Sequence, residues 1–169
     1  KVANQAINTF LNSGTGEVIK LEYHVGFPGP GEDPLYLNNQ ADIGARAAYY
    51  GVAKAPTSFV NARLGNLLST FQKETLKAAR VRFDTIQMLN NPSDKLNVRV
   101  KFTAKQIIPA NSTLHIAIVE NLIDNPKAIG TNGETSFTHV VRKLLPDAVG
   151  TNFSMPILKD SSKTVNVSW

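Results

Sequence analysis

A nine-residue segment rich in proline and glycine, residues 26–34, most constrains how this chain can fold. It contains three prolines and three glycines, so it cannot continue a hydrogen-bonded strand or helix. The residues before it, Val18–Val25, are rich in β-branched and aromatic side chains and predict a strand. The residues after it predict a helix that has Asn39 or Asp42 as its N-cap and ends at Gly51.

A proline stands directly before the next short apolar run, Thr57–Val60, which predicts another strand. Because proline lacks an amide hydrogen, it fits the first residue or the edge of a strand. Residues Tyr50–Val52 and Ala55–Thr57 together resemble the thioredoxin-like signature, in which a helix ends at a glycine and a cis-proline opens the next strand. The resemblance implies a cis Ala55–Pro56 bond, in a loop that faces the start of the first helix. A trans proline on an edge strand is the alternative.

Helical spacing of apolar side chains predicts two further helices, at residues 2–11 and 66–79. The alternation of helices and strands through residues 1–79 is typical of an α/β unit. A thioredoxin-like sheet also has a central strand before its first helix, and these residues do not include one. Because an empty position would leave backbone groups unpaired, we expect one of three arrangements. Residues precede Lys1 in the natural protein, another segment fills the position, or the two flanking strands pair directly. We favour the first, which makes the chain an N-terminally truncated fragment.

The pattern changes near residue 80, where short strand-like segments replace helices. Turn residues separate five such segments, at 81–89, 96–104, 113–120, 137–145 and 164–169. Short strands without intervening helices indicate an antiparallel sandwich of the immunoglobulin or fibronectin type. We therefore predict an α+β protein with two subdomains. Residues 1–79 form a truncated thioredoxin-like α/β subdomain, and residues 80–169 form the β-sandwich.

The side chains needed for several kinds of chemistry are missing or scattered. The sequence has no cysteine, which excludes disulfides, thiolate metal sites and cysteine nucleophiles within its 169 residues. The three histidines lie far apart in sequence, so no metal site or other cofactor is predicted, and no Gly-x-Ser-x-Gly segment indicates a hydrolase. The 18 basic residues are scattered, so nucleic acid is not an expected partner. No apolar run has the length of a transmembrane helix.

Three segments together resemble a known family: Tyr23–Pro28, Tyr50–Asn61 and Phe137–Arg142, the last followed by Gly150. The set resembles the outer-membrane-protein-28-related proteins of Bacteroidetes, which have a thioredoxin-like half and a β-sandwich half. The resemblance implies an exported protein of the periplasm, outer membrane or cell surface, often a lipoprotein. Many members of that family carry a cysteine-containing segment between the first strand and the first helix, and this sequence has none.

Two functional interpretations remain open. The first is a non-catalytic binding or structural module of the cell envelope with a protein or peptide partner; the sequence leaves its oligomeric state undetermined. The second is a thiol–disulfide oxidoreductase whose cysteines lie upstream of Lys1, since such chemistry needs a thiolate near a helix N-terminus. The candidate binding residues are His24, at the end of a predicted strand, and Ala55, Pro56 and Thr57. A histidine that merely hydrogen-bonds the loop backbone is the alternative for His24.

Overall fold

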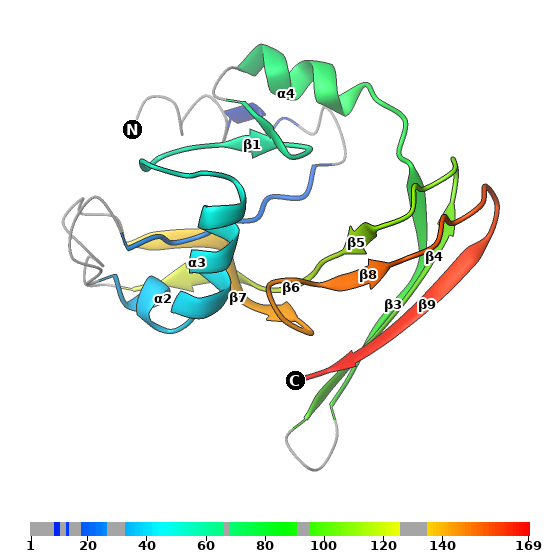
Figure 1. The fold of residues 1–169 in the computed structure, drawn as a ribbon. Helices are drawn as coiled ribbons and strands as arrows, with labels where there is room; N and C mark the ends of the chain where they lie inside the picture. Colours follow the sequence, from blue (N-terminus) through cyan, green and yellow to red (C-terminus); the bar gives the residue numbers. More distant parts are fainter. Residues whose placement is uncertain are drawn as a thin grey trace. The chain divides into compact units, whose positions relative to one another are not determined.

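A computed structural model describes residues 9–10, 13, 18–26, 33–65, 68–90, 95–125 and 135–169. The chain divides into two compact units (Figure 1). Unit 1 comprises residues 1–78 and 120–140, and unit 2 comprises residues 79–119 and 141–169. We expected one division, after residue 79. The first change of unit falls after residue 78, and residues 120–140 group with unit 1. Most of the predicted helix at residues 2–11 and the proline-rich residues 27–32 lie outside the described residues.

The described residues form a mixed α+β structure, mostly strands in several antiparallel sheets with few helices. This confirms the α+β class that the sequence predicts. Within the part of the chain that the structure describes, no helix has both the length and the apolar content needed to cross a membrane.

The helices of unit 1 follow their sequence signals. Helix α3, Gln40–Tyr49, begins after Asn39 at the N-cap position, as predicted. It ends before Gly51, whose φ of 60° is the left-handed conformation that favours glycine after a helix. Helix α4, Leu68–Thr75, is shorter than the predicted helix and buries Phe71 on its apolar face. Each helix therefore has one buried and one solvated side.

A tight hairpin follows the proline. The Ala55–Pro56 bond is cis, as the resemblance implied. Strand β1, Phe59–Val60, pairs antiparallel with β2, Arg63–Leu64. Asn61 and Ala62 connect them with φ values of 47° and 63°, and positive φ at both central residues is typical of a two-residue hairpin turn. The sequence predicts a strand at Thr57–Val60, but gives no sign that it pairs with a second strand across this turn.

The predicted strand at residues 18–25 is wrong as a regular element. Among the described residues, this segment makes one isolated parallel bridge, between Glu22 and Val140. The Glu22 amide donates to the carbonyl oxygen of His139 at 2.9 Å. His139 lies in β7, Ser136–Leu145, and has a φ of 59°. A left-handed residue interrupts the extended repeat of the partner strand, so the bridge does not continue as a ladder.

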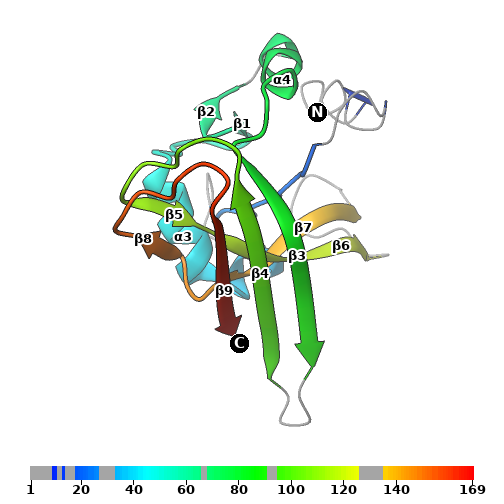
Figure 2. The ribbon, with the colours of Figure 1, turned by 90° about the vertical axis from the view of Figure 1, so that its right-hand side faces the viewer.

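Unit 2 contains a three-stranded antiparallel sheet in the order β3–β4–β9 (Figure 2). Its strands are β3, Val81–Asn90; β4, Leu96–Ala104; and β9, Ser162–Ser168. The register between β3 and β4 shifts between Phe83 and Thr85, which is the mark of a β-bulge. The extra residue explains why β3 alternates imperfectly in sequence whereas β4 alternates cleanly.

Two shorter antiparallel pairings complete the described part of unit 2. Strand β5, Ser112–Leu114, pairs with β8, Thr151–Phe153. Ile108 and Ile157 exchange two backbone hydrogen bonds of 2.9 and 3.0 Å. Buried side chains from the three-stranded sheet and from these segments form two apolar clusters, built on Val98, Val100 and Leu145 and on Phe102, Ala104 and Ile157.

The strand predicted at residues 113–120 is divided at His115 into β5 and β6, Ile116–Asp124. Strands β6 and β7 form a further two-stranded sheet, and each contributes residues to both units. Gly150, with a φ of 78°, lies against the break. A side chain there would place its Cβ 2.7 Å from the carbonyl oxygen of Leu114, so only glycine fits.

Candidate functional site

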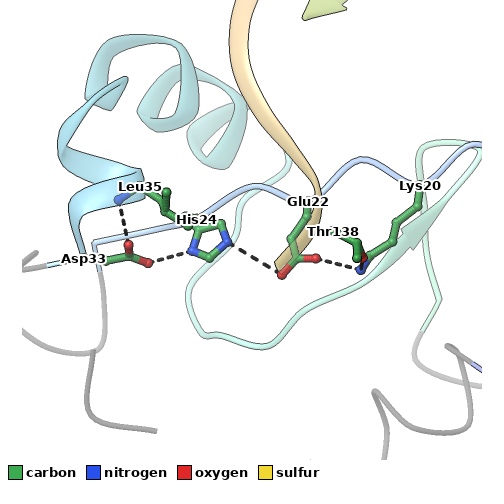
Figure 3. A network of polar contacts seen from close by, with 6 residues as sticks. All are labelled: Lys20, Glu22, His24, Asp33, Leu35 and Thr138. Carbon is green, nitrogen blue, oxygen red and sulfur yellow. Dashed lines mark hydrogen bonds and ion pairs between the residues drawn. The ribbon is translucent and has the colours of Figure 1, made fainter. Parts of the chain in front are cut away.

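A chain of polar side chains in unit 1 begins with three residues of one extended segment. Lys20, Glu22 and His24 occupy alternate positions, and alternate side chains of an extended chain lie on the same side. Figure 3 shows these three residues in a row, with Asp33 at one end and Thr138 at the other. The polar row defined by these five residues contains His24, the histidine that the sequence singled out.

Asp33 places its carboxylate at the His24 end of the row through a local helix signal. It is the N-cap of α2, Pro34–Leu37, and one carboxylate oxygen accepts the Leu35 amide at 2.8 Å. Pro34 is at the first helical position, where its missing amide hydrogen costs nothing. The other oxygen of Asp33 lies 2.7 Å from His24 Nδ1. The contact joins two residues that are nine apart in the sequence.

The imidazole of His24 lies between two carboxylates. Its Nε2 atom is 3.7 Å from Oε1 of Glu22, which is an ion-pair distance but too long for a hydrogen bond. The side chain is 9% exposed, and the ring packs edge-on against Phe137 at 5.0 Å between ring centroids. Phe137 belongs to the buried apolar cluster of unit 1, with Leu35 and Val140. His24 is thus held by Asp33 and by packing.

The other end of the row is fastened to β7. The Nζ atom of Lys20 lies 2.7 Å from Oε2 of Glu22 and donates to Thr138 Oγ1 at 3.0 Å. With the backbone bond from Glu22 to His139, two contacts therefore attach this segment to neighbouring residues of β7. The left-handed conformation of His139 accompanies this attachment and leaves the His139 side chain exposed.

The polar row has part of the geometry of a general base, because Asp33 fixes one ring nitrogen of His24. A general base also needs a reacting group within hydrogen-bond reach of its other nitrogen. Within the described residues, Nε2 is buried and has no hydrogen-bond partner. No group of three or more metal-binding side chains is found among those residues. The contacts support a structural role, in which the row joins residues 20–24 to the start of α2 and to β7.

A second cluster in unit 1 gathers aromatic side chains around a buried cation. Arg46 of α3 lies 4.8 Å from the ring centroids of both Tyr49 and Tyr50 and donates to the Tyr50 hydroxyl at 2.9 Å. Tyr50 packs on Phe59 of β1 with 4.6 Å between ring centroids. Burial raises the pKa of Tyr23, and the charge of Arg46 partly opposes that rise. The cluster thus joins α3 to β1.

The structure places the sequence-predicted binding residues in different settings. His24 is nearly buried in the polar row, whereas Ala55 and Pro56 are exposed. Thr57 is half-buried, and its hydroxyl donates to the carbonyl oxygen of Lys54. The polar contacts of His24 described above go to Asp33 and Glu22, and neither joins it to residues 55–57. Binding at these four residues stays a prediction.

An apolar cavity in unit 2 is a feature that the sequence interpretation missed. It has a volume of about 140 Å³ and opens to the surface. Its lining comes from β3, β4, β5, β8 and the Ile108–Ile157 pair: Val81, Phe83, Phe102, Ile108, Ser112, Thr113, Leu114, Phe153 and Ile157. The sequence shows that most of these residues are apolar. It gives no signal that side chains so far apart leave a space between them.

Sequence signals existed for the polar row. The alternation of Lys20, Glu22 and His24 predicts one shared face, and Asp33 before a proline is a helix-start signal. Thr138 could not be found in this way, because it comes from a strand more than a hundred residues away.

Comparison of this chain with protein-family models, curated proteins and solved structures finds no match.

Proposed function

We propose that this chain is an exported module of the bacterial cell envelope that binds a partner protein or peptide without catalysing a reaction. One observation carries the binding role: the apolar cavity of unit 2 opens beside an edge strand, β3, whose apolar side chains are exposed. Exposed Phe83, Ile86 and Met88 form an apolar strip along one face of β3, and such surfaces mark interaction sites.

The cell-envelope location and the finer fold rest on the family resemblance. Two observations are compatible with a thioredoxin-like unit 1: helix α3 ends at Gly51, and a cis proline precedes β1. A shared apolar core between the three-stranded sheet and the β5–β8 pair is compatible with an immunoglobulin-like sandwich in unit 2. The oxidoreductase alternative requires cysteines outside these 169 residues, because the sequence has none.

Site-specific photocrosslinking in the cells that naturally produce the protein tests the proposal. A photoreactive amino acid replaces Met88 on β3, and in a control protein it replaces Leu158, which is similarly exposed elsewhere in unit 2. We expect the protein in the envelope fraction, with one defined crosslinked species from position 88 and none from position 158. Recovery in the soluble cell interior, or the same products from both positions, would overturn the proposal.

A further inference from the structure

The apolar face of the three-stranded sheet is buried on β4 and continues onto β3, where it is exposed. Directly opposite residues of paired strands lie on the same face. Phe83 pairs with Phe102, Ile86 with Val100 and Met88 with Val98, and the three β4 residues are at most 4% exposed. Their partners on β3 are 47%, 63% and 58% exposed. The β3 row defined by Phe83, Ile86 and Met88 is thus core-like in chemistry and position but open to solvent.

The backbone of β3 is open on the same side. In the order β3–β4–β9, strand β3 has a neighbour only on its β4 side among the described strands (Figure 2). The bulge at Asp84 interrupts the regular edge, which therefore runs from Thr85 to Asn90. An added strand needs such a row of outward backbone donors and acceptors.

The cavity lies at the beginning of the β3 row, because Phe83 belongs to both. Its volume of about 140 Å³ is close to that of engineered apolar cavities of about 150 Å³ that take up a benzene molecule. One aromatic or branched apolar side chain therefore fits it. A strand lying along β3 would have its cavity-filling side chain at one end and smaller apolar contacts along Ile86 and Met88.

The charge around β3 selects among possible partners. Within residues 80–90 and 95–105, exposed basic residues outnumber acidic ones, because Asp84 is the single acidic residue. Asp84 also forms an ion pair with Arg82 at 2.8 Å. On the face opposite the β3 row, Thr85 pairs with Lys101 and Gln87 with Arg99. The basic residues of this region are Arg80, Arg82, Lys95, Arg99, Lys101 and Lys105.

We propose that β3 binds an extended polypeptide segment in which apolar and acidic residues alternate. The segment adds a strand beside Thr85–Asn90, turns its apolar side chains onto the β3 row, and inserts one of them into the cavity. Its acidic side chains then lie on the face of Arg99 and Lys101, because alternate side chains of a strand point to opposite faces. The inference rests on the proposed binding function and names the chemistry of the partner.

A second copy of this chain fits the same edge less well. Pairing of β3 with β3 would join two basic sheet faces, and the described residues 80–90 and 95–105 contain no acid besides the ion-paired Asp84 to balance Arg99 and Lys101. An acidic segment, in contrast, is attracted by the positive charges of Arg99 and Lys101.

Fluorescence anisotropy with the full chain and a labelled ten-residue peptide tests the inference. The probe alternates glutamate with valine and has one phenylalanine. One control peptide has lysine in place of glutamate. A second has N-methylated amides along the edge that would pair with β3. We expect binding of the glutamate peptide that weakens several-fold between about 50 and 500 mM NaCl. Neither control peptide should bind comparably.

Matched variants locate the binding. Ile86→Ser should weaken binding at least about tenfold, because the peptide buries this side chain, whereas Leu158→Ser should not; both residues are 63% exposed. Charge reversal at Arg99 and Lys101 should weaken binding of the glutamate peptide and strengthen binding of the lysine peptide. If Ile86→Ser unfolds the protein, this charge-reversal variant still tests the proposal. The backbone of Leu96 bonds to Trp169 on the β9 side, so the amides of Ile86, Met88 and Asn90 point away from β4. Slower amide exchange at these three residues in the complex would support strand addition.

Three results would overturn the inference: no binding of the glutamate peptide, equal binding of either control peptide, or concentration-dependent dimers of the chain that Ile86→Ser abolishes. The proposed function fails separately. If position 88 still crosslinks a defined envelope partner while the glutamate peptide does not bind, the binding role stands and the partner chemistry is wrong. If position 88 crosslinks nothing, the binding role itself is wrong.

Discussion

At the scale of single residues, two aspartates show how local surroundings decide what a carboxylate does. Asp33 accepts a helix amide with one oxygen and contacts His24 with the other, so it joins His24 to the start of α2. Asp84 is the bulged residue of β3, and it accepts from the Thr103 hydroxyl and from Arg82. Each carboxylate thus fixes the conformation of the chain around it.

Replacement of Asp84 by asparagine should remove a pH-dependent part of the stability. The hydrogen bond from Thr103, followed by that from Arg82, lowers the pKa of the Asp84 carboxyl. Its stabilising contribution is therefore present above the usual aspartate pKa of about 3.9 and is lost as the pH falls through the lower folded value. We expect the difference in unfolding free energy between the wild type and Asp84→Asn to be largest near neutral pH and to shrink below about pH 4.

Urea unfolding at a series of pH values measures this difference. Asp124→Asn makes the same charge change at an exposed strand residue and serves as the control for net charge. A difference for Asp84→Asn that stays constant down to pH 2, or that grows as the pH falls, would contradict the assignment.

At the scale of an element, β3 combines a bulge with an open apolar edge. Val81 and Phe83 before the bulge, and Ile86 and Met88 after it, lie on the sheet face that holds the buried residues of β4, so the apolar positions change from odd to even residue numbers. The bulge therefore lets an irregular sequence present one continuous apolar face. It also shortens the regular edge that a further strand can join.

Deletion of Asp84 should leave the sheet folded. Without it, Val81, Phe83, Ile86 and Met88 alternate perfectly, and the bulge is no longer needed to keep them on one face. Deletion of Lys101, an exposed residue of the paired strand, should instead turn Phe102 and Ala104 away from the core. Loss of such buried side chains costs on the order of 3–5 kcal/mol, against a typical domain stability of about 5–15 kcal/mol.

Thermal unfolding followed by near-ultraviolet circular dichroism distinguishes the two deletions. We expect a cooperative transition for the Asp84 deletion and a lost or strongly lowered transition for the Lys101 deletion. Equal damage from both deletions would show that the bulge is required for the fold.

At the scale of the whole molecule, the chain crosses between its two units more than once. Residues 120–140 leave the strand-rich second half and supply part of unit 1. Within unit 1 they provide Phe137 and Val140, which form the buried apolar cluster with Leu35. The N-terminal half thus lacks part of its own core.

A fragment of residues 1–79 should therefore not fold cooperatively by itself. It lacks the core partners of Leu35 and the β7 backbone that binds Glu22. Residues 120–140 appended to it through a flexible linker should restore a cooperative transition, because linkers cost little once the contacts form. Thermal unfolding by circular dichroism measures both proteins beside the full chain. A sharp transition for the 1–79 fragment alone would show that residues 120–140 are not needed.

The sequence by itself determined those features that depend on neighbouring residues. Helix α3 begins after Asn39, although the Asn39 side chain makes no capping hydrogen bond, and it ends before Gly51, whose left-handed conformation is a local signal for the end of a helix. The clean alternation of β4 determined its bounds at Leu96 and Ala104 as well as its buried face. The α+β class follows from the sum of such local signals.

Only the tertiary structure decided the features that join distant residues. The predicted strand at residues 18–25 depends on a partner for its backbone. That partner is the part of β7 where His139 has a left-handed conformation, which no local sequence pattern predicts. Likewise Thr138 reaches Lys20 across more than a hundred residues. The cavity beside Phe83 exists because separate segments pack without filling the space between them. Local propensity indicates which secondary structures each segment can adopt. Strand pairing and side-chain packing between distant segments decide which of these structures the folded protein contains.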